Sequence, residues 1–178
     1  MPSGNTHEFF NMVSLPVVLT ALQPEGLLPF IAGYLFSTFY LSPDMDLPHS
    51  KPSKRWGSLK IIWVPYQSFV SHRSLISHSP VISSVIRLLY LLLPLFLTIL
   101  IIFKVIDEVF FEGGLSVILQ QDIGILNIET EIFFKNLIFY FAYGVIIGDL
   151  LHLLLDFSVS FLKGMKKRIN KKFKFLKI

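Results

Sequence analysis

The sequence predicts an all-α protein, an integral membrane helical bundle with about four apolar helices and a polar, motif-bearing loop. Of its 178 residues, 53% are hydrophobic and only 16% are charged, and the mean hydropathy is +0.63. Soluble domains usually contain about 25% charged residues. Two long apolar blocks, at 80–106 and 132–155, account for much of this bias. The composition therefore favours a membrane protein over a soluble domain.

The four apolar blocks differ in length, and each length predicts a different element. The first two, 9–22 and 27–41, are shorter than the roughly 20 residues that a transmembrane helix needs. The sequence "QPEG" between them is typical of a turn, so they predict a shallow or tilted hairpin. The blocks 80–106 and 132–155 can each cross a hydrocarbon core of about 30 Å, and both are predicted to be membrane helices.

Basic and acidic residues are segregated between the connecting segments. The polar segment 42–79 holds five lysines and arginines and the tail 163–178 holds eight, whereas 107–131 is acidic and has none. Short cytoplasmic loops carry an excess of Lys and Arg, so the N-terminus, the 42–79 loop and the tail are predicted to be cytoplasmic. We therefore expect a membrane-embedded helical domain at 1–162 and a basic cytoplasmic tail that suits anionic lipid headgroups. Nucleic acid is not an expected partner, because this tail is its only support.

The segment "GDLLHLLLDF" places Asp149, His152 and Asp156 at the end of the last apolar block. Spacings of three and four residues put all three side chains on one helical face. An i,i+4 histidine–carboxylate pair such as His152 and Asp156 can chelate zinc from one helix. A divalent cation would also offset the few kcal/mol that ionisable groups cost in a membrane. The alternative is an internal salt bridge between the carboxylates and a protonated histidine.

Four of the five histidines lie near helix ends that the predicted topology brings to one membrane face. The groups that would meet there are His7, Asp44, Asp46, His72, His78, His152 and Asp156. The fifth histidine, His49, lies in the loop, where solvent exposure is expected. Taken alone, "THE" and "SPDMD" also fit a helix start and a capping turn. Because the chain has no cysteine, this donor set favours a divalent metal ion, zinc first, with manganese or iron as alternatives.

Six short segments, in this order, resemble a known family: "MPSGNTHE", "SPDMDLP", "KRWG", "WVPYQ", "SHRSLISHSP" and "GDLLHLLLD". The family comprises uncharacterised metal-binding membrane proteins catalogued as a domain of unknown function, and the resemblance spans nearly all of residues 1–157. This family is similar to predicted membrane-bound metal-dependent hydrolases and, more distantly, resembles the zinc-dependent phospholipase C superfamily. The resemblance implies the metal ligands His7, Asp44, His72 or His78, His152 and Asp156, with Asp46 and Asp149 as further ligands or as partners of the ligands.

The residues and the resemblance together favour a metal-dependent hydrolase that acts on a phosphoester, with a lipid as one candidate, at the cytoplasmic face. Asp46 or Asp149 is the candidate general base, and Arg73 is the candidate phosphate-binding residue. Arg73 has an alternative role as an interfacial anchor beside the aromatic residues of its loop. The rival function is a non-catalytic structural or metal-handling protein, which a closed ligand set would favour.

Overall fold

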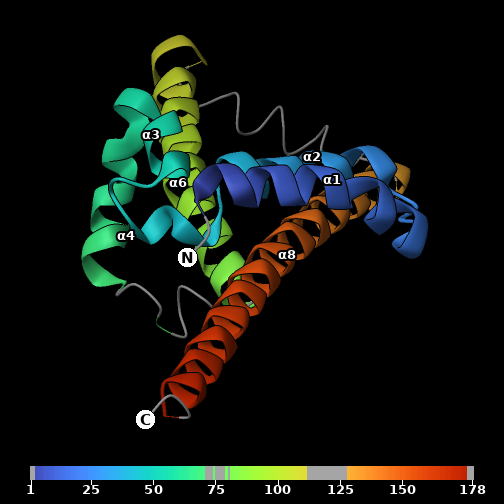
Figure 1. Cartoon of the computed structure of the whole chain (residues 1–178). Coiled ribbons are helices and arrows are strands. Elements are labelled where there is room, and N and C mark those ends of the chain that lie inside the picture. The colour runs from blue at the N-terminus through green and yellow to red at the C-terminus, as the bar shows by residue number, and fades with distance from the viewer. Residues whose placement is uncertain (1–2, 71–73, 75–78, 80, 112–127, 176–178) are drawn as a thin grey trace.

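The computed structural model describes residues 3–70, 74, 79, 81–111 and 128–175, and the regular elements within these ranges are all helical (Figure 1). The long helices are α1 (Gly4–Leu22), α2 (Leu27–Phe39), α6 (Ile82–Phe111) and α8 (Ile128–Phe175). The polar segment between α2 and α6 also folds into short helices: η1 (Pro43–Asp46), α3 (Lys51–Arg55), η2 (Gly57–Trp63) and α4 (Val64–Phe69). The all-α prediction is confirmed for the described residues.

The four apolar helices are present, but only two described helices are long and apolar enough to cross a membrane. They are Ile82–Phe111, which is α6, and Thr130–Asn170 within α8. Of the four predicted apolar helices, two are therefore candidate membrane spans. The 13 residues of α2 extend about 20 Å, short of a hydrocarbon core of about 30 Å. The α1–α2 pair forms the antiparallel hairpin that the sequence predicts (Figure 1).

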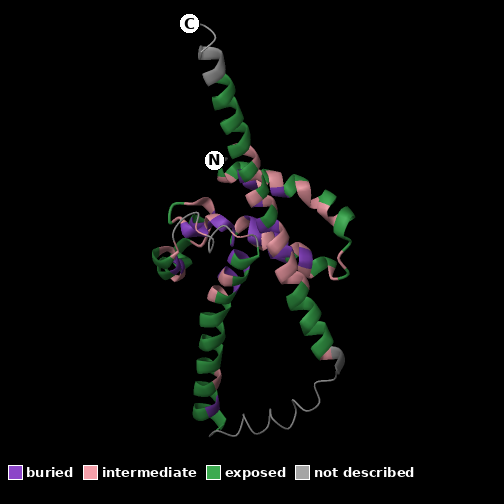
Figure 2. Ribbon diagram, turned by 90° about the horizontal axis from the view of Figure 1, so that it is seen from below, coloured by how far each residue is buried: buried purple, intermediate pink, exposed green. Residues whose placement is uncertain are grey.

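The basic tail is the continuation of α8, with no break in the helix at residue 162. α8 runs for 48 residues, from Ile128 to Phe175. The lysines, arginine and methionine of this region are good helix formers, and the region contains no proline. Beyond residue 160, α8 therefore projects from the bundle, and its side chains are exposed as far as Asn170 (Figure 2).

α2 packs along α8 at a distance that only glycine permits. An ideal Cβ atom on Gly33 would lie 1.9 Å from the carbonyl oxygen of Phe141, and one on Gly144 would lie 2.0 Å from that of Phe30. Gly144 and Gly148 form a small-xxx-small pattern, which lets helix backbones approach closely. This contact fixes the polar end of α2 against the part of α8 that carries His152.

Buried residues gather where α1, α2 and the short helices meet the middle of α8, and the outer arms of α6 and α8 are exposed (Figure 2). The apolar core is formed by Leu41, Met45, Trp63, Tyr66, Leu88 and Val145. It joins η1, η2 and α4 to α6 and α8. The short helices therefore form a cap on the bundle, and η1 is held beside α8.

Candidate metal centre

His7 is held on the buried face of α1. The side chain of Ser3 caps this helix by accepting a hydrogen bond from the Thr6 backbone N–H. His7 and Asn11 are its two buried residues and lie one helical turn apart. The Asn11 amide donates to Thr38 Oγ1 and to the carbonyl oxygen of Gly148, each at 3.1 Å. These bonds fix α1 against α2 and α8 and set the position of His7.

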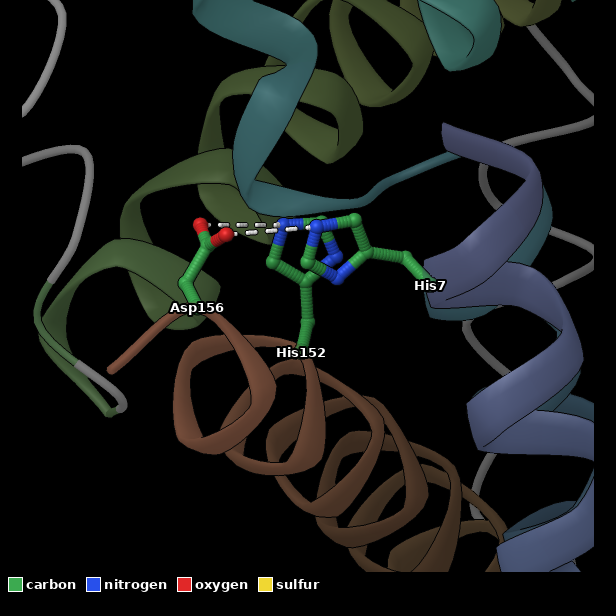
Figure 3. Close-up of side chains that lie close together, drawn as sticks. All are labelled: His7, His152 and Asp156. Atoms are coloured by element: carbon green, nitrogen blue, oxygen red, sulfur yellow. Dashed lines mark ion pairs between the residues drawn. The ribbon is translucent and has the colours of Figure 1, made fainter. Parts of the chain in front are cut away.

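His7, His152 and Asp156 form a compact buried group between α1 and α8 (Figure 3). One ligand atom from each residue lies within 4.8 Å of the others. His7 Nε2 is 3.3 Å from Asp156 Oδ1, and His152 Nε2 is 4.0 Å from Asp156 Oδ2. The two imidazole rings are stacked, with centroids 3.7 Å apart. Both rings therefore present nitrogen atoms to the same carboxylate, as Figure 3 shows.

Asp44 approaches this group from η1. Its Oδ2 atom lies 3.7 Å from His152 Nε2, and its side chain is half-buried. Ser42 caps η1 by accepting a hydrogen bond from the Asp44 backbone N–H. A cavity of about 10 Å³, room for one water molecule, lies beside these groups. Its lining residues are Gly4, His7, Glu8, Thr38, Ser42, Asp44, Pro52 and His152.

The donor set fits a divalent metal ion. Zinc bonds of about 2.0–2.1 Å in a tetrahedron place ligand atoms about 3.3 Å apart, close to the His7–Asp156 distance given above. His152 Nε2, the atom that faces Asp156, is buried and makes no hydrogen bond within the described part of the chain. A buried imidazole nitrogen without a hydrogen bond is costly, and coordination would satisfy it. The site can therefore bind a metal through His7, His152 and Asp156, with Asp44 at its edge.

Glu8 joins the end of α1 that carries His7 to the cap of short helices, a contact that was not predicted from the sequence. Its carboxylate forms ion pairs with Lys51 and with Arg55, the latter at 2.7 Å, and both cations come from α3. Arg55 Nη1 also donates to the carbonyl oxygen of Phe39 at the end of α2. No local pattern predicts this contact, because the partners lie more than 40 residues from Glu8.

Asp149 lies outside the three-residue group and joins three helices. Its carboxylate accepts hydrogen bonds from Ser37 of α2 and from Ser84 and Arg87 of α6. Asp149 and Arg87 are both fully buried. These contacts favour a structural role, and a catalytic role for Asp149 stays a prediction. The sequence analysis did not single out Arg87, although a lone arginine in an apolar block is a signal for such a pair.

Asp46 is buried in η1, near the same network. Tyr66 of α4 interacts electrostatically with Asp46, Asp149 and Arg87. Burial raises the pKa of Tyr66, and the neighbouring Arg87 guanidinium offsets this only in part. The Tyr66 hydroxyl therefore stays protonated at neutral pH. A role for Asp46 as a general base stays a prediction.

The remaining predicted site residues are His72, Arg73 and His78, and all three lie outside the described residues. Their roles as ligands and phosphate-binding group stay predictions. His49 lies on the surface, as expected for a loop histidine outside the site.

Comparison with known proteins assigns the chain to a family. Residues 2–166 match the family model described as "Uncharacterized metal-binding protein (DUF2227)". An uncharacterised protein of Aquifex aeolicus (strain VF5) is 38% identical over 141 residues, which cover 76% of this chain and 93% of the relative. No solved structure matches the chain. The matched range contains His7, Asp44, His152 and Asp156, whereas the resemblances to hydrolases and to phospholipase C stay predictions. The chain thus belongs to this family of uncharacterised metal-binding proteins.

Proposed function

We propose that this protein is a membrane-embedded enzyme that holds a divalent metal ion at His7, His152 and Asp156 and hydrolyses a phosphoester. The observation that carries the proposal is the convergence of three buried ligands from two helices within 4.8 Å of one another. Zinc is the first candidate, because two imidazoles and a carboxylate are the ligand set of many catalytic zinc sites. Manganese and iron are the alternatives.

Membrane placement is supported by the apolar residues that α6 leaves exposed. Only 6% of its most apolar window is buried, whereas the core helix of a soluble protein would be mostly buried. Large exposed apolar surfaces on soluble monomers are rare. The distribution of lysine and arginine supports a cytoplasmic location for the cap and for the C-terminal part of α8. In that orientation the site lies near the headgroups, which makes a lipid phosphoester a reasonable substrate and anionic headgroups partners of the basic tail.

A bound divalent ion supplies Lewis-acid chemistry, since it polarises a phosphoryl oxygen and acidifies a water molecule. The chain's own contribution is to hold the ligands rigidly, through the hydrogen bonds of Asn11 and the ion pairs of Glu8. Asp44 lines the cavity beside His152 and is placed to accept a proton from a water molecule there. We retain Asp46 and Asp149 as further candidate bases, and Arg73 as the candidate phosphate-binding group.

The size of the cavity favours a second candidate function. About 10 Å³ accommodates a water molecule but not a phosphoester, so hydrolysis requires the wall between α1 and the cap to open. A site that stays closed would instead suit a non-catalytic role, either structural or in metal handling.

Elemental analysis by mass spectrometry on detergent-purified protein tests the metal site. The wild type should carry stoichiometric metal, and the double variant His152→Ala, Asp156→Ala should lose it. His49→Ala is the matched control and should retain the metal, since His49 is exposed. Metal that persists in the double variant, or a wild type that stays metal-free after reconstitution, would refute both candidate functions.

A phosphoester hydrolysis assay distinguishes the enzyme from the non-catalytic metal protein. The loaded protein would be assayed with an aryl phosphomonoester, an aryl phosphodiester and phospholipid vesicles, beside the double variant at equal concentration. Hydrolysis that disappears in the double variant supports the enzyme. Stoichiometric metal with no hydrolysis of any of the three supports the non-catalytic protein.

A further inference from the structure

The buried residues of α1 are polar, and several of its apolar residues are exposed. Its two buried residues are His7 and Asn11, which are 5% and 1% exposed. Phe9, Val13 and Val17 are 70%, 58% and 67% exposed. A surface helix of a soluble protein shows the opposite arrangement, with the apolar stripe turned to the core.

The two sets lie on opposite sides of the helix. His7 and Asn11 are four residues apart, as are Phe9, Val13 and Val17, so each set follows one face. The sequence around the exposed set carries almost no charge, since Glu25 is the only Asp, Glu, Lys or Arg between residues 9 and 43. A water-exposed hairpin of this length would normally carry several charges.

The apolar surface continues from the hairpin to both candidate membrane spans. A cavity of about 420 Å³ opens between α2, α6 and α8, and almost all of its surface is apolar. Its walls include Ala32 and Phe36 of α2, Leu91 of α6, and Ile138 and Phe141 of α8. The medium that covers the exposed residues of α6 and α8 can therefore also reach α2, the helix that pairs with α1 in the hairpin.

We propose that the face of α1 formed by Phe9, Met12, Val13 and Val17 lies in the hydrocarbon region of a lipid bilayer. The hairpin is then a membrane-immersed element that does not span. A protein partner is less suited to this face, because specific interfaces contain about one hydrogen bond per 100–200 Å². Two polar side chains lie at the ends of this face, and both have partners within the chain. Thr20 donates to backbone carbonyls of its own helix, and the Thr6 hydroxyl shares a hydrogen bond with that of Ser3.

This inference rests on the membrane placement in the proposed function, and it adds a consequence for the metal centre. An α-helix is about 10 Å in diameter, so His7 lies one helix thickness from the lipid.

Site-directed spin labelling tests the inference, and the chain suits it because it contains no cysteine. The variants Met12→Cys, Val13→Cys and Val17→Cys would be labelled with a nitroxide and reconstituted into phosphatidylcholine–phosphatidylglycerol vesicles. Collision rates would be measured with oxygen, which concentrates in hydrocarbon, and with chromium oxalate, which stays in water. Leu97→Cys on α6 is the membrane reference, and Lys54→Cys on α3 is the water-exposed reference.

We expect the ratio of oxygen to chromium oxalate collisions at the three α1 positions to be several-fold higher than at Lys54 and close to that at Leu97. A ratio that matches Lys54 would overturn the inference, and protection from both reagents would overturn it in favour of a second copy or another protein. If the label at Leu97 is also in water, the membrane placement itself fails. If Leu97 is in lipid and α1 is in water, only this inference fails.

Discussion

The imidazole rings of His7 and His152, which come from opposite ends of the chain, are stacked with their centroids 3.7 Å apart and their planes 13° from parallel. Two positively charged rings about 4 Å apart would repel each other by about 4 kcal/mol at an effective dielectric constant of 20. Metal ions bind histidine through the neutral imidazole, so an ion in this site would avoid that repulsion. The stack places Nε2 of both rings beside the Asp156 carboxylate, although the two histidines lie on different helices.

Metal binding should stabilise the fold, because the ligands come from α1 and α8 and an ion would link these helices. Zinc at 100 times its dissociation constant should raise the free energy of unfolding by about 2.7 kcal/mol. Thermal unfolding in detergent, with and without a chelator, measures this difference. His7→Ala should abolish the zinc-dependent shift and His49→Ala should preserve it. An undiminished shift in His7→Ala would exclude His7 as a ligand.

Asp44 and Asp46 lie two residues apart in η1 and should respond differently to replacement by asparagine. Asp44→Asn changes a group 3.7 Å from His152, so metal affinity should fall by about 10- to 100-fold. Asp46→Asn should leave metal affinity unchanged and, if Asp46 is the general base, should lower phosphoester turnover by about 100-fold or more. Titration with a competing chelator gives the affinities, and the esterase assay gives the turnover. Equal metal affinities in the two variants would remove Asp44 from the site.

Gly144→Ala should disrupt the packing of α2 on α8. The added methyl group would lie 2.0 Å from the Phe30 carbonyl oxygen, so the backbones must separate. The expected destabilisation is about 1–3 kcal/mol, with weaker metal binding because α2 supports Asn11 through Thr38. Gly164→Ala is the matched control in the same helix, since nothing lies within 4 Å of its Cβ position. Gly164→Ala should leave the free energy of unfolding unchanged or raise it by up to about 1 kcal/mol. Thermal unfolding of both variants measures the difference between them.

The buried pair of Arg87 and Asp149 should be more sensitive to loss of one partner than to loss of both. Arg87→Met leaves the Asp149 carboxylate buried without its cation, and the expected cost is about 3–5 kcal/mol. The double variant Arg87→Met, Asp149→Leu removes both charges and should recover part of that stability. Denaturation of the two variants beside the wild type measures the coupling. A double variant less stable than Arg87→Met would show that Asp149 stabilises the fold mainly through its other partners, Ser37 and Ser84.

Several parts of this protein were predictable from local sequence patterns. Uninterrupted apolar runs predict helices whatever their partners, and α6 and α8 follow from this rule. The spacing of His152 and Asp156 fixes their shared face, because side chains four residues apart are neighbours on any helix. His7 and Asp44 were predicted to join them from the order of the helices and the distribution of basic residues.

Other features depend on contacts between distant segments, and no local pattern contains them. Asp149 shares the helical face of His152, yet its partners are Ser37, Ser84 and Arg87, which α2 and α6 bring to it. The bonds of Asn11 to Thr38 and Gly148 likewise exist only after three helices have packed.

The sequence by itself determined the helical class of this protein, the residue types of its candidate metal centre and the shared helical face of His152 and Asp156. The tertiary structure decided that His7 stacks on His152, that Asp149 joins the three helices α2, α6 and α8, and that α1 turns its apolar side outward. The reason is physical: helical periodicity fixes neighbours three and four residues apart, whereas the distance between two helices is set by how closely their surfaces pack. In this protein the contacts of Gly33 and Gly144 set that distance for α2 and α8.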